Sequence, residues 1–388
     1  MRKLAGIYIH IPFCKQACYY CNFHFSTSLD LKDAMISAII KEIKMTSVSL
    51  LNVNDDIEII ETIYFGGGTP SLLSVIDLQN ILSTLKNNYS INADAEITIE
   101  ANPDDITFEK LESWKATGIN RLSIGIQSFK EEDLQWMNRA HNKTQALECI
   151  AMAKKAGFNN FSVDLIYGTP ELTDEEWKKN IEEVIKMEAP HIACYALTVE
   201  PKTALQKMIA LKKKADVNTD DQARQFLLLM KWMQEAGYEH YEISNFAKPG
   251  FRSRHNSSYW QGKKYIGIGP SAHSYDGSKR KWNIANNSLY VMAIENDSTS
   301  FEEEILTETD RLNEYVMTSL RTIEGLNLET IKRNFSLKER NRIEKSLIDY
   351  VTNGMIIYAG ENLVLTNEGK LFADGIAADL FAIEDVSH

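Results

Sequence analysis

Long apolar runs are absent from this sequence. No stretch of the 388 residues approaches the roughly eighteen consecutive apolar residues that a membrane-spanning helix needs, so we expect no transmembrane segment. The amino-terminal residues lead directly into a strand-like pattern, which does not indicate a signal peptide. These absences predict a cytoplasmic protein, and they leave open whether a partner brings it to a membrane surface.

Cysteine and basic residues are also scarce. Five cysteines, several of them close together, are too few for a disulfide framework. The 42 Lys and Arg residues are outnumbered by 54 Asp and Glu residues, and the net charge of -12 argues against a surface that binds nucleic acid. Low-complexity segments are missing as well. The hydrophobic share of 44% is typical of a folded globular protein, and the length allows two or three domains.

Strand-like and helical patterns alternate through the first half of the chain. Six short apolar runs, each of the kind that predicts a buried strand, lie at residues 5–12, 59–65, 95–100, 121–127, 161–167 and 191–199. Amphipathic stretches that predict helices lie at residues 29–50, 74–89, 107–117, 130–156 and 173–187. The alternation predicts an α/β fold, either a partial (β/α)6 barrel or a doubly wound open sheet. In both, ligands bind at the carboxyl ends of the strands.

The pattern changes after Pro201. A polar helical stretch leads into a segment rich in Gly, Ser, His and Tyr, and three more helical patterns then precede a hairpin-like segment at residues 354–366. Helices followed by a hairpin indicate a winged-helix-like α+β domain. Such domains often bind DNA, but the mixed charges here suit a docking or lid role at least as well. We therefore predict a partial barrel at 1–215, a barrel extension at 216–303 and a winged-helix-like domain at 304–388.

Three cysteines lie together in the loop after the first predicted strand: Cys14, Cys18 and Cys21. Their thiolates can converge on one metal centre, but they supply only three ligands. Structural zinc would need a fourth ligand, for which His10 and His24 are the nearest candidates. A [4Fe–4S] cluster would instead keep one iron open to an exchangeable ligand.

The CxxxCxxC spacing at the start of a βα series resembles the radical S-adenosylmethionine (SAM) superfamily. In that family the three cysteines hold a [4Fe–4S] cluster, and the amino and carboxylate groups of SAM chelate the fourth iron. An electron from the cluster cleaves SAM to a 5′-deoxyadenosyl radical. The resemblance implies that Cys14, Cys18 and Cys21 are the cluster ligands.

Glycines and polar residues end the following predicted strands. Gly67, Gly68 and Thr69 follow the second strand, and glycines let a ligand approach the backbone closely, although a tight strand-to-helix turn is the alternative. No Lys-Ser or Lys-Thr pair follows, so a Walker A loop is not indicated.

Glu100, Gln127 and Asp164 end the third, fourth and fifth strands. Their oxygens can accept hydrogen bonds from an ammonium group and from ribose hydroxyls, and Arg139 can offer two parallel N–H groups to a carboxylate. Taken one at a time, the strand-end residues read as caps and Arg139 as a solvated helix charge. Their register on successive strands favours a binding site.

Longer motifs narrow the resemblance to the oxygen-independent coproporphyrinogen III oxidase group. These are Tyr-Ile-His-Ile-Pro-Phe-Cys, Gly-Gly-Gly-Thr-Pro-Ser, Ile-Glu-Ala-Asn-Pro-Asp, Gly-Ile-Gln-Ser-Phe and Asp-Leu-Ile-Tyr-Gly-Thr-Pro, and the likeness covers nearly the whole chain. It implies SAM contacts at Tyr8, Tyr20, Gly67, Gly68, Thr69, Glu100, Gln127, Arg139 and Asp164, and at Ala196, where the spacing differs.

Two departures from the oxidases point to the heme chaperone branch, the HemW-type proteins. The oxidases carry a further cysteine where this chain has Phe23, and they have an extension before the first strand. The chaperone branch bears an HNxxYW motif, which is present here from His255 to Trp260. Because neutral imidazole is a common axial heme ligand, His255 is the candidate heme ligand and His273 a second one. The alternative is that His255 only hydrogen-bonds a loop under Trp260.

Three hypotheses follow. The first is a heme-binding chaperone that carries a [4Fe–4S] cluster and SAM and delivers heme to heme-accepting proteins. The second is an enzyme that oxidatively decarboxylates coproporphyrinogen III, so the sequence leaves open whether the chain is catalytic. The third is a zinc-stabilised α/β binding protein.

Overall fold

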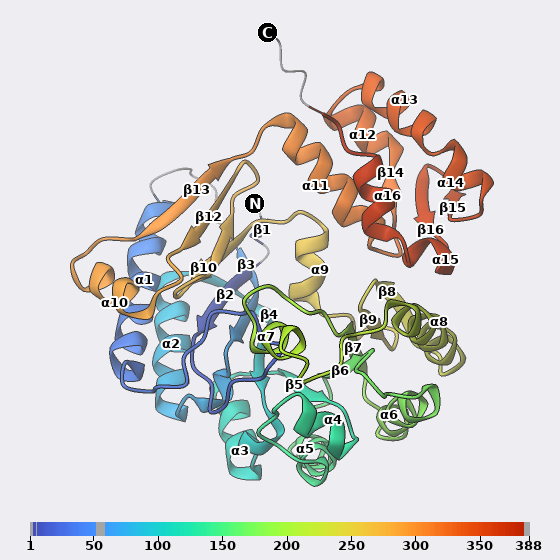
Figure 1. The fold of residues 1–388 in the computed structure, drawn as a ribbon. Coiled ribbons are helices and arrows are strands. Elements are labelled where there is room, and N and C mark those ends of the chain that lie inside the picture. Colours follow the sequence, from blue (N-terminus) through green and yellow to red (C-terminus); the bar gives the residue numbers. More distant parts are fainter. Residues whose placement is uncertain (1–2, 5, 52–58, 384–388) are drawn as a thin grey trace.

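The computed structural model describes residues 3–4, 6–51 and 59–383. Most of its strands join one sheet, in the order β13-β12-β11-β10-β2-β3-β4-β5-β6-β7-β9-β8 (Figure 1). The central strands are parallel, and they are β2 (Gly6–Ile11), β3 (Ile59–Gly67), β4 (Ser90–Ala101), β5 (Arg121–Gln127), β6 (Phe161–Tyr167) and β7 (His191–Ala196). The predicted α/β partial barrel is confirmed. Residue 5, where the first strand was expected to begin, lies outside the described residues.

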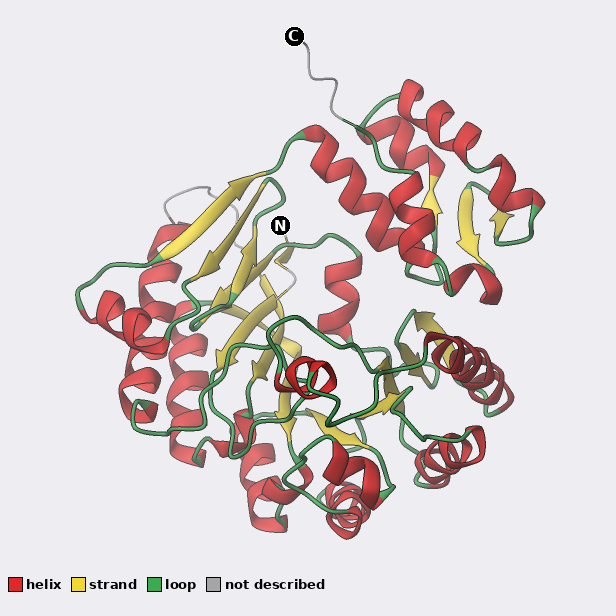
Figure 2. Cartoon of the chain, viewed as in Figure 1, coloured by secondary structure: helices red, strands yellow, loops and turns green. Residues whose placement is uncertain are grey.

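Helices cover the outside of these strands (Figure 2). They are α1 (Lys32–Leu51), α2 (Val75–Asn88), α3 (Phe108–Thr117), α4 (Glu131–Trp136), α5 (Lys143–Lys155) and α6 (Asp174–Lys186). Ser74, Asn142 and Thr173 begin α2, α5 and α6 with reciprocal capping boxes. The apolar faces of these helices and the Ile-rich strands form one core, which holds the strand ends in fixed positions.

The segment after β7 extends the sheet at both edges. Helices α7 (Ala204–Ala210) and α8 (Thr219–Glu235) lead to β8 (Glu239–Glu242) and β9 (Asn245–Ala247), and β9 runs antiparallel beside β7. Helix α9 (Arg254–Trp260) then crosses to the opposite edge, where β10 (Tyr265–Ile268) pairs in parallel with β2. The sheet continues outward through β11 (His273–Tyr275), β12 (Lys279–Asn283) and, after α10 (Asn287–Glu295), β13 (Phe301–Ile305).

The carboxyl-terminal region forms a second core with a small sheet of its own. Its strands are β14 (Leu326–Asn327), β16 (Asn362–Leu365) and β15 (Ile356–Ala359), in that order. Its helices are α11 (Glu308–Leu320), α12 (Leu328–Asn334), α13 (Leu337–Ser346), α14 (Ile348–Thr352), α15 (Asn367–Lys370) and α16 (Ala373–Asp379). A backbone bond from Ile243 to Arg321 and an ion pair between Arg252 and Glu324 join this region to the barrel side. The winged-helix-like arrangement of helices and hairpin agrees with expectation, whereas the three domain boundaries stay a prediction.

No helix in the described part of the chain is long and apolar enough to cross a membrane.

Candidate functional site

A cavity of about 500 Å³ opens at the carboxyl ends of the barrel strands. The residues around it come from the cysteine loop and from the ends of β3 to β7. They include Cys14, Cys18, Cys21 and nine of the ten predicted SAM contacts: Tyr20, Gly67, Gly68, Thr69, Glu100, Gln127, Arg139, Asp164 and Ala196. The fold thus brings together nearly all the residues that the motifs singled out, although their individual roles stay predictions.

Backbone hydrogen bonds fix the cysteine loop against the barrel. The Cys14 amide donates to the Ser26 carbonyl at 3.0 Å, and the Tyr19 amide donates to the Met137 carbonyl at 3.1 Å. The Leu205 amide of α7 donates to the Tyr19 carbonyl at 2.8 Å. Because separate parts of the barrel hold the loop at several points, the three thiols are positioned before any ligand binds.

An ion pair adds a further anchor. Lys15, between the first two cysteines, lies 2.9 Å from the carboxylate of Asp104 and also contacts Asp105. Asp105 is buried and accepts a hydrogen bond from Ser71 at 2.8 Å. The loop is therefore tied to the short 3-10 helix η2 (Pro103–Asp105) that follows β4.

The thiols are in an environment that opposes ionisation. Burial raises the pKa of the Cys14 thiol to about 11, against a hydrogen bond from Thr69 that works in the opposite direction. Burial also raises the pKa of Cys21. Neutral thiols are poor ligands, so a metal centre would have to supply the positive charge that stabilises the thiolates. Within the described residues, no three His, Cys, Asp or Glu side chains come close enough to hold a single metal ion.

The glycine loop after β3 packs against the cysteine loop. The Gly68 amide donates to the Ile11 carbonyl at 2.8 Å, and a Cβ atom at Gly68 would lie only 2.6 Å from the Phe13 carbonyl oxygen. Gly67 has φ +107°, and a Cβ atom there would lie 2.7 Å from the His10 ring. The close approach of the two loops by itself requires glycines here, which supports the tight-turn interpretation, and the role of Gly67 and Gly68 in ligand binding stays a prediction.

Two carboxylates form the floor of the cavity. Burial raises the pKa of Glu100 to about 7, and the neighbouring Asp164 adds to this effect, while a hydrogen bond from Tyr64 at 2.8 Å works against it. Burial raises the pKa of Asp164 to about 6, against the attraction of Arg121 and a hydrogen bond from Ser123. The raised pKa values show that the two carboxylates lack solvent or a cation to stabilise their charge. A cationic ligand or a hydrogen-bond donor would supply that stabilisation.

Arg139 lies in the cavity wall. Its Nη1 donates to the Cys18 sulfur at 3.2 Å, and its Nη2 donates to Asn102 at 2.7 Å and to the Gly125 carbonyl at 2.8 Å. Its Nε is buried without a hydrogen-bond partner. The side chain is therefore not a solvated helix charge. Gln127 has a left-handed backbone with φ 69°, next to an irregularity in the β5–β6 register, which turns it toward the cavity rim.

Tyr8 and His255 lie outside the cavity lining. The Tyr8 hydroxyl donates to His10 Nδ1 at 3.3 Å. His255 is 2% exposed, with Nδ1 2.7 Å from the Thr62 hydroxyl and Nε2 2.9 Å from the Tyr259 hydroxyl. Both ring nitrogens are thus occupied by protein, and burial lowers the pKa of His255 to about 3, so the imidazole is neutral.

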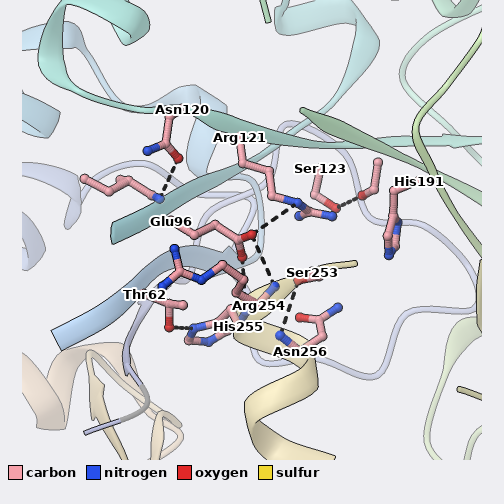
Figure 3. Close-up of polar contacts among 12 residues, drawn as sticks. Thr62, Glu96, Asn120, Arg121, Ser123, His191, Ser253, Arg254, His255 and Asn256 are labelled. Carbon is pink, nitrogen blue, oxygen red and sulfur yellow. Dashed lines mark hydrogen bonds and ion pairs between the residues drawn. The ribbon is translucent and has the colours of Figure 1, made fainter. Parts of the chain in front are cut away.

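The backbone around His255 enters a buried polar network (Figure 3). The amides of Arg254 and His255, at the start of α9, donate to the carboxylate of Glu96 at 3.2 and 3.1 Å. Arg121 of β5 lies 3.9 Å from the same carboxylate. This network joins α9 to the interior of the barrel, a role that the HNxxYW motif alone does not reveal.

Several cavity residues were missed by the sequence reasoning: Asn102, Ser123, Gly125, Tyr195 and Phe25. Ser123 stands in register with Glu100 on the neighbouring strand, and Gly125 with Asp164. Residues two apart on a strand face the same side, so counting back from Gln127 would have predicted Gly125 and Ser123 as further cavity residues. The others depend on loop geometry.

Comparison with known proteins places the chain in a family. Residues 8–184 match the Radical SAM superfamily, and residues 306–372 match the HemN C-terminal domain. The solved structure of coproporphyrinogen III oxidase (HemN) from Escherichia coli superposes with a TM-score of 0.83 over 97% of this chain and 90% of that one, at 22% identity, a likeness of fold.

Full-length curated relatives carry the name heme chaperone HemW. The Lactococcus lactis protein is 30% identical, with 100% of both chains covered, and the Mycobacterium tuberculosis protein is 33% identical, with 97% of this chain and 94% of the relative covered. The Escherichia coli protein is 31% identical, with 98% of both covered. These likenesses confirm the recognition drawn from the motifs: the chain belongs to the HemW family of the radical SAM superfamily.

Proposed function

We propose that this protein is a heme chaperone that carries a [4Fe–4S] cluster and SAM, binds heme and delivers it to heme-accepting proteins. The observation that supports this most directly is the likeness to curated heme chaperones over 97% to 100% of the chain. Phe23, which is 67% exposed at the cavity, stands where the related oxidases carry a further cysteine.

The cavity has the donors that the cluster and SAM need. Cys14, Cys18 and Cys21 would hold three irons, and the neighbouring Arg139 and Thr69 would support the thiolates through their N–H and O–H groups. When bound, the cluster supplies an open iron for the SAM amino acid group and an electron for SAM cleavage. Three thiols with no fourth ligand beside them in the described part of the chain fit this requirement better than they fit structural zinc.

The polar strand ends suit SAM. Glu100 and Asp164 would accept hydrogen bonds from its ammonium and ribose hydroxyl groups, and Gln127 would add an amide at the rim. The cavity, at about 500 Å³, lies in the range of about 300–1,000 Å³ for a single small-molecule site. We therefore expect heme to bind on another surface, close to this cavity.

The role of His255 as heme ligand stays a prediction. Coordination through Nε2 would require Tyr259 to release the ring, and coordination through Nδ1 would require Thr62 to do so. The alternative reading, in which His255 serves as an internal hydrogen-bond partner, agrees with its present contacts.

Anaerobic reconstitution followed by two parallel assays tests the proposal. We expect iron and sulfide in a ratio that matches one four-iron cluster, uptake of about one heme per chain, and heme transfer to an apo-hemoprotein. In the second assay, coproporphyrinogen III, SAM and a reductant are supplied. Turnover to protoporphyrinogen would establish the oxidase alternative instead, and zinc without iron would establish the third one.

A further inference from the structure

The histidines of this chain differ sharply in how accessible their ring nitrogens are. Among the described residues, six histidines each have a ring nitrogen within hydrogen-bond distance of another protein group: His10, His24, His141, His191, His240 and His255. In the same part of the chain, only the ring of His273 has no such contact, and its side chain is exposed. An imidazole can coordinate iron without rearrangement only if a nitrogen is free.

The surroundings of His273 suit a porphyrin. His273 pairs with Trp282 across β11 and β12, and their rings stack with centroids 5.8 Å apart and planes 25° apart. Tyr275 pairs with Arg280 two residues further along, so all four side chains lie on one face of the sheet. The face thus combines an imidazole, an indole, a phenol and a guanidinium, and β13 places the carboxylates of Glu304 and Glu302 beside Arg280 and Trp282. Arg280 has five N–H donors; it uses Nη2 for Glu314 and also hydrogen-bonds the Tyr265 hydroxyl, and its remaining N–H groups are left for a propionate.

The strands that carry this face are held rigidly from behind. Glu42 of α1 is buried and accepts hydrogen bonds from the Gly269 amide at 2.8 Å, from Asn283 at 2.7 Å and from the Tyr290 hydroxyl at 2.6 Å. Gly269 precedes the turn into β11, and Asn283 ends β12. A ligand site gains precision when its strands are fixed by such buried contacts.

The face lies close to the cysteine loop. Strand β10 separates β11 from β2, and β2 leads directly into the cysteines. His10 of β2 stacks against His24 with ring centroids 6.1 Å apart. Burial lowers the pKa of His10 to about 4, and the nearby charges of His24 and His273 add smaller contributions in the same direction. Heme on this face would therefore lie beside the cavity of the cysteine loop and would leave that cavity open for the cluster and SAM.

We infer that heme binds on the face of β11 and β12 formed by His273, Tyr275, Arg280 and Trp282, and that His273 is its axial ligand. This assignment rests on the proposed heme-binding function. A ring nitrogen of His273 would donate its lone pair to the iron, with no change in oxidation state. Because His273 is exposed, a heme held by it would stay accessible to an acceptor protein, which is what delivery requires.

The test is a heme titration of the full-length, cluster-loaded protein under anaerobic conditions. Ferric heme is the probe, and the Soret band reports both affinity and axial ligation. The variants are His273→Ala and His273→Met, with His24→Ala as the matched control, since His24 is a nearby imidazole that is bonded to Asn287. His255→Ala is titrated in parallel.

We expect His273→Ala to lower heme affinity about tenfold or more, while His24→Ala stays within about twofold of the wild type. Added imidazole should restore the wild-type band position in His273→Ala, and His273→Met should shift it because a thioether replaces the imidazole. A merely structural role would produce neither spectral effect.

Wild-type affinity and spectrum in His273→Ala would overturn the assignment, as would a loss of binding confined to His255→Ala. If the wild-type protein itself takes up no heme, the proposed function fails, and that result is distinct from a failure of the assignment alone.

Discussion

Replacing Glu100 by Gln should stabilise the ligand-free protein at alkaline pH. The Glu100 carboxyl is held in the cavity with a pKa of about 7, against the ordinary 4.5. A shift of about 2.5 pKa units corresponds to roughly 3 kcal/mol, by which the ionised carboxylate destabilises the empty fold. A glutamine amide can still accept the Tyr64 hydrogen bond, and it cannot ionise.

The sign follows from proton binding. Between pH 4.5 and about 7 the folded protein keeps a proton on Glu100 that the unfolded chain releases, so this group makes the protein less stable as pH rises through that window. The Gln variant has no ionisable group at this position, so its free energy of unfolding does not fall for this reason as pH rises. Its stability relative to wild type should therefore rise by about 3 kcal/mol between about pH 5 and pH 8.5.

Thermal unfolding followed by circular dichroism measures the effect. For a chain of this length, 3 kcal/mol corresponds to a melting temperature difference of about 4 °C. The protein must be free of cluster and SAM, because a bound cation would change the pKa. A melting-temperature difference that does not vary with pH, or that favours wild type at about pH 8.5, would refute the account of a strained carboxyl in the cavity floor.

Three further predictions concern the loop and α9. Cys14→Ala should abolish cluster loading, measured as bound iron and sulfide, whereas Cys149→Ala, which removes a buried thiol outside the cavity, should load normally. Lys15→Met should leave the buried Asp105 without its cation and destabilise the loop by about 1–3 kcal/mol, seen as faster iron release to a chelator; an unchanged rate would argue against this anchor. His255→Ala should lower the free energy of unfolding in urea by about 2–4 kcal/mol, since it removes the two hydrogen bonds of a buried ring and leaves a cavity.

Much of the site could be predicted from sequence because its residues are placed by local rules. The chain reverses at the end of every parallel strand, so polar residues that end successive strands must meet at one edge of the sheet. Glu100, Asp164 and the three cysteines reach the same cavity for this reason. The capping boxes at Ser74 and Thr173 likewise begin their helices where the sequence places them.

The proposed heme site could not be predicted in the same way. His255 has the motif, yet its nitrogens face Thr62 and Tyr259, and Thr62 is far away in sequence. His273 lacks a recognised motif, and its exposure depends on the pairing of β11 with β12 and on the Glu42 contacts behind them. Such contacts join segments that local sequence patterns do not connect.

The sequence by itself therefore determined the alternation of strands and helices, the family and the residues at the strand ends, since periodicity and spacing act over a few residues. Only the tertiary structure decided that β10 joins the barrel beside β2, that α9 is bound to Glu96 in the interior, and which imidazole of the described residues has no hydrogen-bond partner. The physical reason is that burial and hydrogen-bond saturation of a side chain depend on segments that meet only after folding.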